Sequence, residues 1–242
     1  LFQSYAVLIT LALYLGFLLS YKIIPKFFNK LPLDRGREFT LKENAEAAKG
    51  KPTGAGVYFI TVFVLLCFIF VPLDMLQGGS LILTWLMMLT GFLDDRSANS
   101  WGEYRKALLD FVICLAAALL LAYIKIHTAA DGKIYFWLPF LTNQIAVPPA
   151  LYLIIALVLL WASVNTTNCT DGVDGLSGTL VLVALLTMGV IFYFILGHTD
   201  IAKYLLVPHL VNGASWGTMT FVLAGVLMGY LWHNAFPSKV LM

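Results

Sequence analysis

Long apolar stretches separated by polar connections dominate the pattern of this chain. A helix needs about twenty apolar residues to cross a bilayer, and seven stretches reach or approach that length. They cover residues 5–24, 57–73, 81–93, 107–124, 149–164, 180–196 and 217–232. Because lipid offers no hydrogen-bond partners, each stretch must satisfy its own backbone, which favours helices over the shorter alternating strands of a barrel. The pattern predicts an all-α polytopic membrane protein.

Details of the pattern sharpen this expectation. The third stretch is short, with Gly78 and Gly79 expected just outside its start. The first stretch lacks a basic flank and a small-residue cleavage site, so it is expected to be a membrane span rather than a removable signal peptide. Residues 129–132 (AADG) precede an aromatic run, which predicts a small β-hairpin in the connection 125–148. Without an internal repeat, residues 1–242 are expected to form a single membrane domain.

Composition agrees with a membrane protein. Hydrophobic residues make up 60% of the 242 residues and charged residues 12%, against roughly 25% charged in soluble domains. The net charge of +2 gives no reason to expect nucleic-acid binding. If the chain crosses the bilayer seven times, twelve of the fifteen Lys and Arg residues lie on one side, eight of them within residues 22–51. The positive-inside rule makes that side cytoplasmic and places the N-terminus outside.

The three cysteines predict no covalent or metal chemistry. Cys67 and Cys114 lie in apolar stretches and Cys169 in a polar one, without a CxxC spacing. We therefore expect no disulfide and no thiolate metal site.

A polar stretch, residues 165–178 (NTTNCTDGVDGLSG), lies between two uncharged apolar runs. Asn, Asp, Gly and Ser are common in turns, so a solvated turn is the simple alternative. A plain turn needs only about four such residues, and ionisable groups held against a bilayer are costly and usually functional. We expect a loop here that carries Asp171 and Asp174 into a cytoplasmic site.

A second acidic group, Asp94 and Asp95, follows the third apolar stretch on the same predicted side. Adjacent carboxylates repel each other unless a cation or donor compensates, which indicates Mg²⁺, a lysine or proton transfer. The alternative is an ordinary solvated helix end.

Basic residues flank both acidic groups. Arg105 and Lys106 begin the fourth apolar stretch and are suited to holding phosphate, although Lys106 and Asp110 also have the spacing of an intrahelical pair. The segment 49–56 (KGKPTGAG) offers glycines and backbone donors that can approach a phosphate, or simply a flexible start to the next helix. Mg²⁺ is commonly held by one or two carboxylates and substrate phosphates. The set therefore predicts a nucleotide-diphosphate substrate, and its membrane setting predicts a lipid co-substrate.

Four segments resemble, in order, the motifs of the polyprenyl-phosphate N-acetylhexosamine-1-phosphate transferases. They are residues 51–56 (KPTGAG), 91–95 (GFLDD), 168–176 (NCTDGVDGL) and 234–237 (NAFP). The resemblance runs through the whole chain and is strongest to the bacterial members that transfer phospho-N-acetylmuramoyl-pentapeptide. Thr170 and Thr53 favour these over the members that transfer N-acetylglucosamine-1-phosphate.

The resemblance implies a reaction and its setting. Undecaprenyl phosphate would attack the sugar-linked phosphate of UDP-N-acetylmuramoyl-pentapeptide (UDP-MurNAc-pentapeptide), giving lipid I and UMP, with Mg²⁺ as cofactor. The enzyme would lie in the bacterial inner membrane with its site at the cytoplasmic face, and the resemblance also implies a homodimer.

The resemblance also implies roles for single residues. Asp94 would activate the lipid phosphate, with Asp95 in support and Asp171 as a third catalytic residue. The substrate-binding residues would be Lys49 or Lys51, Thr53, Lys106, Asn168, Asp174 and Asn234.

The family usually has ten spans, and a Gly-Asp-x-Gly-Ser motif carrying a metal-binding Asp follows Asn-x-x-Pro. The resemblance therefore places the main metal ligand just after Met242, beyond this chain. A different class, a secondary transporter, would show carboxylates near the bilayer midplane or paired broken helices in repeated halves. The sequence shows neither, because the clustered Asp residues lie near the inner ends of the apolar stretches.

Overall fold

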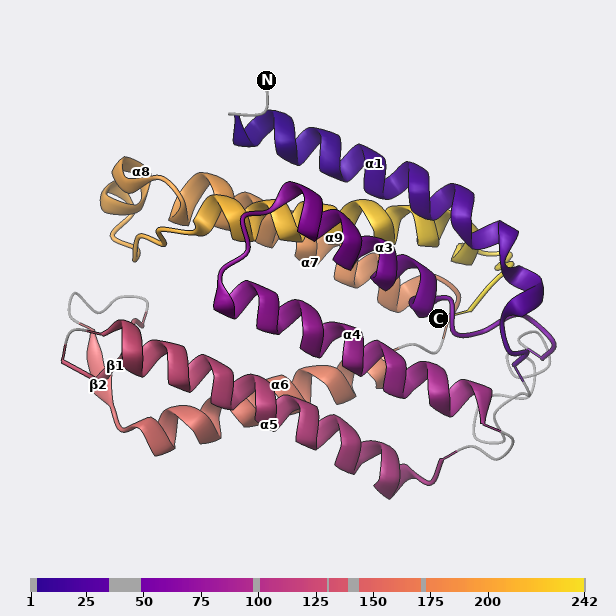
Figure 1. The fold of residues 1–242 in the computed structure, drawn as a ribbon, viewed down its shortest axis with the longest axis horizontal. Coiled ribbons are helices and arrows are strands. Elements are labelled where there is room, and N and C mark those ends of the chain that lie inside the picture. Colours follow the sequence, from indigo (N-terminus) through magenta and orange to yellow (C-terminus); the bar gives the residue numbers. More distant parts are fainter. Residues whose placement is uncertain are drawn as a thin grey trace.

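The computed structural model describes residues 4–34, 49–97, 101–129, 131–138, 144–170 and 173–241. The long helices lie side by side along one axis of an elongated bundle (Figure 1). They are α1 (Tyr5–Lys26), α4 (Met75–Arg96), α5 (Glu103–Thr128), α6 (Pro149–Thr170), α7 (Leu176–Val190) and α9 (Gly213–Asn234). The shorter elements are η1 (Phe28–Lys30), α3 (Gly56–Phe70), the π-helical η2 (Ile191–Leu196) that continues α7, and α8 (Thr199–Tyr204).

The described part of the chain confirms the all-α polytopic fold and corrects the number of full-length spans. Six helices are long and apolar enough to cross a membrane. The predicted span 57–73 instead forms α3, which has 15 residues and is about 22 Å long at ~1.5 Å per residue. It ends early because proline disfavours helical backbone in the residue before it, and Val71, which precedes Pro72, is extended (φ −118°, ψ 127°).

The start of α4 is a second correction, because Gly78 and Gly79 lie inside the helix rather than before it. A capping box begins the helix upstream: the Gln77 N–H donates to Asp74 Oδ1 (2.7 Å) and the Asp74 N–H donates to Gln77 Oε1 (3.0 Å). Gly79 also packs beneath α5, since a Cβ there would lie 2.4 Å from Leu120 Cδ2. Gly79 therefore serves helix packing rather than a turn.

Small residues bring α1 and α9 into close contact. A Cβ added to Gly225 would lie 2.2 Å from the Leu13 carbonyl oxygen, and one added to Gly229 would lie 2.7 Å from Ser20 Cβ. On α1, a Cβ added to Gly16 would lie 3.1 Å from the backbone nitrogen of Val226 in α9. Membrane helices lack a hydrophobic force between them, so small residues at i and i+4 let backbones approach and gain packing energy.

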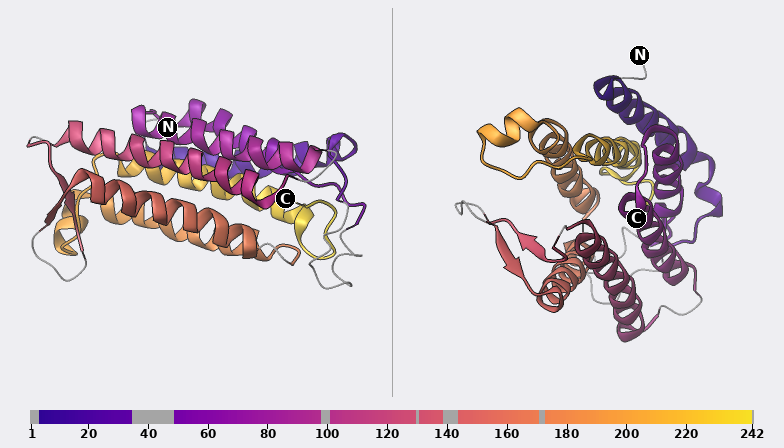
Figure 2. Two further views of the ribbon diagram at one scale, coloured as in Figure 1. Left: turned by 90° about the horizontal axis from the view of Figure 1, so that it is seen from below. Right: turned by 60° about the vertical axis from the view of Figure 1, so that its left-hand side comes forward.

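Around this pair, the helices form two neighbouring groups (Figures 1 and 2). In the first group α9 contacts α1, α3, α7 and η2, and 61% of its apolar window is buried. In the second group α4 packs on α5, and α5 packs on α6. Contacts of α3 with α4 and of α6 with α7 join the groups. Because α9 contacts every other helix of the first group, it is the central helix of that group.

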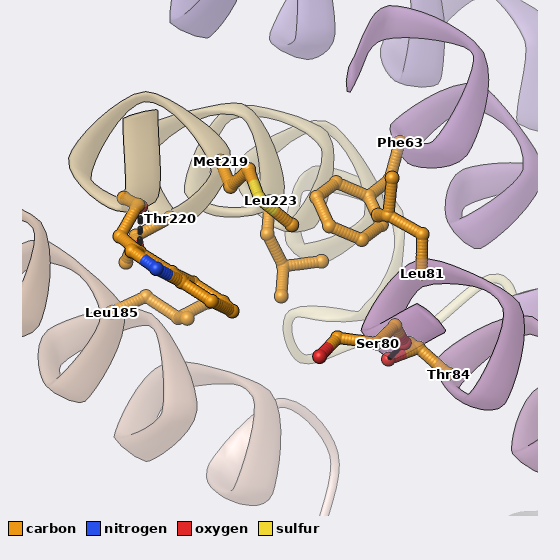
Figure 3. A pocket seen from close by; sticks show the side chains of 9 residues that line it. Phe63, Ser80, Leu81, Thr84, Leu185, Met219, Thr220 and Leu223 are labelled. Carbon is orange, nitrogen blue, oxygen red and sulfur yellow. Dashed lines mark hydrogen bonds between the residues drawn. The ribbon is translucent and has the colours of Figure 1, made fainter. Parts of the chain in front are cut away.

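A cavity of about 170 Å³ lies between α3, α4, α7 and α9 (Figure 3). Most of its lining is apolar, and it includes two hydroxyls that bond within their own helices: Thr84 Oγ1 donates to the Ser80 carbonyl and Thr220 Oγ1 to the Trp216 carbonyl, both at 2.8 Å. Ser80 and Trp216 lie near the starts of α4 and α9. The cavity is therefore distant from the motif residues at the other ends of these helices.

The predicted hairpin is present at the end of the bundle that we expect to face outward. Strand β1 (Ile134–Phe136) pairs antiparallel with β2 (Ile145–Val147), with Ile134 opposite Val147. Asp131 accepts hydrogen bonds from the Tyr135 hydroxyl and from the Lys133 N–H. Both bonds, that from Tyr135 first, lower the pKa of Asp131, and the bond to Asp131 raises the pKa of Tyr135.

The α1–α9 contact predicts a sharp difference between two Gly→Ala substitutions. Gly225→Ala should lower the free energy of unfolding by about 1–3 kcal/mol, because the new Cβ overlaps the Leu13 backbone. Gly78→Ala, also within a helix, meets no atom within 4 Å and should be neutral or stabilising by up to ~1 kcal/mol. Thermal unfolding in detergent measures both, and equal midpoints for the two variants would contradict the packing described here.

Candidate functional site

The predicted motifs meet at one end of the bundle, opposite the β-hairpin (Figure 1). The connection before α3, the end of α4, the start of α5, the residues before α7 and the segment after α9 all lie at this end (Figures 1 and 2). Segments from across the chain thus share one polar region at the end of an apolar bundle.

Residues 235–241, which we call the return segment, fold back against the last residues of α9. The Lys239 N–H donates to the His233 carbonyl (2.8 Å), and Asn234 Nδ2 donates to the Val240 carbonyl (2.9 Å). Asn234 is buried, so its amide shapes this turn of the chain. Whether Asn234 also binds substrate stays a prediction.

The return segment then pairs with the connection that leads into α3. The Leu241 N–H donates to the Pro52 carbonyl (2.8 Å), and the Ala55 N–H donates to the Leu241 carbonyl (3.4 Å). On the other side of this connection, the Thr53 N–H donates to the Pro32 carbonyl (2.8 Å). Residues 52–55 are therefore held between the segment after α1 and the segment after α9.

Lys51 connects three of these segments through its ammonium group. Lys51 Nζ lies 2.7 Å from Ser238 Oγ and 3.4 Å from Asp174 Oδ2. The Ser238 N–H also donates to Asp174 Oδ2 (3.3 Å). Asp174, just before α7, is thereby joined to the connection before α3 and to the return segment.

Thr53 makes a similar link to the acidic pair at the end of α4, because its hydroxyl donates to Asp95 Oδ2 (3.2 Å). The neighbouring Gly54 has φ +77°, which disfavours a side chain, and a Cβ there would also lie 3.0 Å from the Phe92 ring. This backbone conformation lets residues 53–55 lie directly against α4.

The two adjacent carboxylates have different partners. While Asp95 accepts from Thr53, Asp94 Oδ1 accepts from the Trp101 N–H (2.8 Å) and Asp94 Oδ2 lies 3.8 Å from Lys106 Nζ. Because each carboxylate has its own donor or cation, the expected repulsion between the two neighbouring Asp residues is compensated. Within the described residues Lys106 pairs with Asp94 rather than with Asp110.

Arg105 extends this positive region, because its guanidinium lies over the Trp101 ring, 4.3 Å from the ring centroid. Arg105 and Lys106 both lie near the start of α5, where the helix dipole also favours anions. The region next to Asp94 is therefore positively charged, and the phosphate-binding role of Lys106 stays a prediction.

The polar stretch 165–178 is only partly the loop that we expected. Helix α6 continues to Thr170, so residues 165–170 are helical. Their side chains make this possible by bonding back along the helix, as Thr166 does to the Ala162 carbonyl (2.8 Å) and Thr170 does to the Thr166 carbonyl (2.8 Å). Helix α7 begins at Leu176, and Gly175 just before it takes φ +75°.

Three of the predicted site residues have no contact described above. Asn168 is exposed near the end of α6, and Lys49 is exposed in the turn before Lys51. Between the two lysines that the sequence left open, Lys51 is the one joined to Asp174. Asp171 lies outside the described residues.

Sequence reasoning missed two participants. Ser238 binds both Lys51 and Asp174, and the only signal for it was its position four residues after Asn234. Trp101 contacts Asp94 through its backbone N–H, which no residue type reveals.

Among the described residues, no group of three His, Cys, Asp or Glu residues could share a metal ion. Asp94, Asp95 and Asp174 instead have protein donors or lysines as partners. Mg²⁺ therefore stays a prediction.

Comparison with known proteins matches residues 78–242 to glycosyl transferase family 4. The phospho-N-acetylmuramoyl-pentapeptide-transferase of Treponema pallidum (strain Nichols) is 52% identical over 242 residues, which cover 100% of this chain and 65% of that protein. The protein of the same name from Aquifex aeolicus (strain VF5) is 29% identical over 96% of this chain and 66% of its own length. The chain thus spans a little under two thirds of the length of these two relatives.

The geometry around Lys51 predicts that one hydroxyl stabilises the site. Ser238→Ala removes an acceptor from a charged group, which should lower the free energy of unfolding by about 1.5–3 kcal/mol. The matched control is Ser163→Ala, because in the described part of the chain the Ser163 hydroxyl donates to the Leu159 carbonyl of its own helix alone, and its loss should cost less than about 0.5 kcal/mol. Thermal unfolding of both variants measures this, and a Ser238→Ala midpoint equal to that of the control would contradict the role given to Ser238.

Proposed function

The chain belongs to glycosyl transferase family 4, and from that premise we propose that it is part of an enzyme that transfers phospho-N-acetylmuramoyl-pentapeptide from UDP-MurNAc-pentapeptide to undecaprenyl phosphate. The products would be lipid I and UMP. The relative with 52% identity over the whole chain carries the name of this transferase, which supports the choice of donor. The apolar bundle supports a lipid as the acceptor.

The observation that carries the proposal is the cluster of four motifs at one end of the bundle. Lys51 and Ser238 are 187 residues apart and hydrogen-bonded, and Lys51 and Thr53 reach the carboxylates before α7 and at the end of α4. Phosphoryl transfer depends chiefly on positioning and on neutralising charge. A site with acidic and basic groups at a membrane surface suits a donor dissolved in water and an acceptor dissolved in lipid.

The site residues form two groups, one for the lipid phosphate and one for the diphosphate of the donor. Asp94, oriented by the Trp101 N–H and next to Lys106, would take the proton from the lipid phosphate. Lys106 would hold that phosphate as it approaches. Lys51, next to Asp174, would neutralise the diphosphate of the donor.

The bond changes balance in this arrangement. An oxygen of the lipid phosphate forms a bond to the phosphorus that carries the sugar, and the bond from that phosphorus to the bridging oxygen breaks. The bridging oxygen leaves with UMP and keeps the electron pair. Lysine side chains next to the diphosphate would stabilise the charge that develops on this leaving group.

The transfer itself is the test of the proposal. The full-length gene product should transfer labelled sugar phosphate from UDP-MurNAc-pentapeptide to undecaprenyl phosphate, measured with and without Mg²⁺. Asp94→Asn should lower the turnover number at least about a hundredfold, because a general base is worth roughly that much or more. Asp131→Asn makes the same change in the hairpin at the opposite end and should leave turnover unchanged.

Two outcomes would count against this assignment. Transfer from UDP-N-acetylglucosamine but not from UDP-MurNAc-pentapeptide would move the protein to the other branch of the superfamily. Full turnover by Asp94→Asn would show that the acidic pair is only a helix end.

The cytoplasmic position of the site can be tested with the native cysteines of this part of the chain. Cys169 is exposed near the end of α6, whereas Cys67 and Cys114 are buried. A membrane-impermeant maleimide should therefore modify Cys169 in inverted vesicles and not in intact spheroplasts, with Cys169→Ser as the control. Modification of Cys169 in intact spheroplasts would instead place this end of the bundle outside the cell and contradict the proposed orientation.

A further inference from the structure

A histidine at the end of α9 completes the hydrogen bonding of α1. Pro25 lies inside α1, and proline has no N–H to donate to the carbonyl four residues earlier. That carbonyl belongs to Tyr21, and His233 Nε2 lies 3.0 Å from its oxygen. Because a carbonyl only accepts, Nε2 carries the proton and donates it to Tyr21.

The surroundings of His233 hold its ring in this position. The ring stacks on the Tyr21 ring, with centroids 5.3 Å apart and an interplanar angle of 16°. The Phe28 ring meets it nearly at right angles, 5.9 Å away. His233 is only 8% exposed, so the hydrogen bond is sheltered and losing the donor would leave a carbonyl without the partner that its helix cannot supply.

The backbone of His233 is also bonded to the return segment. Its carbonyl accepts from the Lys239 N–H (2.8 Å), and the next residue, Asn234, holds the Val240 carbonyl (2.9 Å). The return segment then places Ser238 on Lys51 and Asp174. His233 therefore links the Tyr21 carbonyl of α1, through its ring, to the return segment, through its backbone.

We propose that His233 is a positioning residue for the nucleotide-sugar donor, acting through its hydrogen bond to the carbonyl that Pro25 leaves free in α1. The donor is a uridine-diphosphate sugar in this proposal, which rests on the proposed function. His233 contacts neither reacting group; it fixes the end of α9 so that the return segment, Lys51 and Asp174 are arranged before the diphosphate arrives. Positioning of this kind affects donor binding more than the chemical step.

Two substitutions separate the hydrogen bond from the ring packing. His233→Phe keeps an aromatic ring against Tyr21 and Phe28 but removes the donor. His233→Gln removes the ring but places an amide N–H₂ near the position of Nε2. In the full-length protein, His233→Phe should raise the KM for UDP-MurNAc-pentapeptide roughly fivefold to tenfold, with less than about a twofold change in kcat or in the KM for undecaprenyl phosphate. His233→Gln should restore most of the donor KM.

Pro25→Ala gives a second and more specific test. It returns an N–H to residue 25, so Tyr21 regains its helical partner and no longer needs His233. The effect of His233→Phe on the donor KM should therefore be much smaller in the Pro25→Ala background. An effect of the same size in both backgrounds, or a His233→Gln variant as impaired as His233→Phe, would overturn the proposal.

Hydrogen–deuterium exchange decides the positioning independently of turnover. His233→Phe should speed exchange in peptides covering residues 235–241, where the Lys239 and Leu241 N–H groups are bonded, and should leave the middle of α4 unchanged. The faster exchange should disappear when Pro25→Ala is added. If the wild-type protein transfers no sugar phosphate, the proposed function fails; unchanged exchange in residues 235–241 of His233→Phe would overturn the role of His233 itself.

Discussion

The close contact of α1 and α9 is the interaction on which the rest of the structure depends. In lipid, helices gain little from hiding apolar surface, so their association depends on packing and on hydrogen bonds between them. Gly225 and Gly229 leave room for the backbone of α1, and Gly16 does the same from the opposite side. Because α9 also contacts α3 and α7, its position against α1 sets the position of the whole first group of helices. The end of α9 then determines where the return segment lies.

The polar end of the bundle consists of charges that have partners but remain accessible. Lys51 and Asp174 are 3.4 Å apart with 25% and 21% of their side chains exposed, and Lys106 and Asp94 are 3.8 Å apart with 33% and 14% exposed. Ion pairs with this exposure contribute only about 0–1 kcal/mol. A phosphate can therefore take a lysine from its carboxylate at little cost, while the carboxylate keeps a backbone donor. The protein holds its charged groups in place without binding them too tightly to meet a substrate.

Much of the architecture could be predicted from the sequence, because membrane helices follow directly from runs of apolar residues. The hairpin followed from a local turn pattern, and the shared end of the four motifs followed from the alternation of the apolar stretches and the sorting of Lys and Arg. The errors arose where context changed the meaning of a residue type. Gly78 and Gly79 are typical of turns but lie within α4, and residues 165–170 are typical of a loop although Thr166 and Thr170 bond back along α6. In the site, the partners of Asp94 could not be predicted, because one is the backbone N–H of Trp101. The link between His233 and Tyr21 was equally hidden, since it depends on two helices far apart in sequence.

The central claim is that α9 and its return segment assemble a binding site for a nucleotide-sugar diphosphate at one end of the bundle. The most direct measurement is photolabelling of the full-length protein with a UDP-sugar analogue that carries a photoreactive group beside its diphosphate, followed by mass spectrometry of the labelled peptides. The label should appear in peptides that contain residues 51–55, 173–176 and 235–241, and an excess of unlabelled UDP-MurNAc-pentapeptide should prevent it. Protectable labelling confined to the hairpin end, in peptides with residues 134–136 or 145–147, would contradict the account.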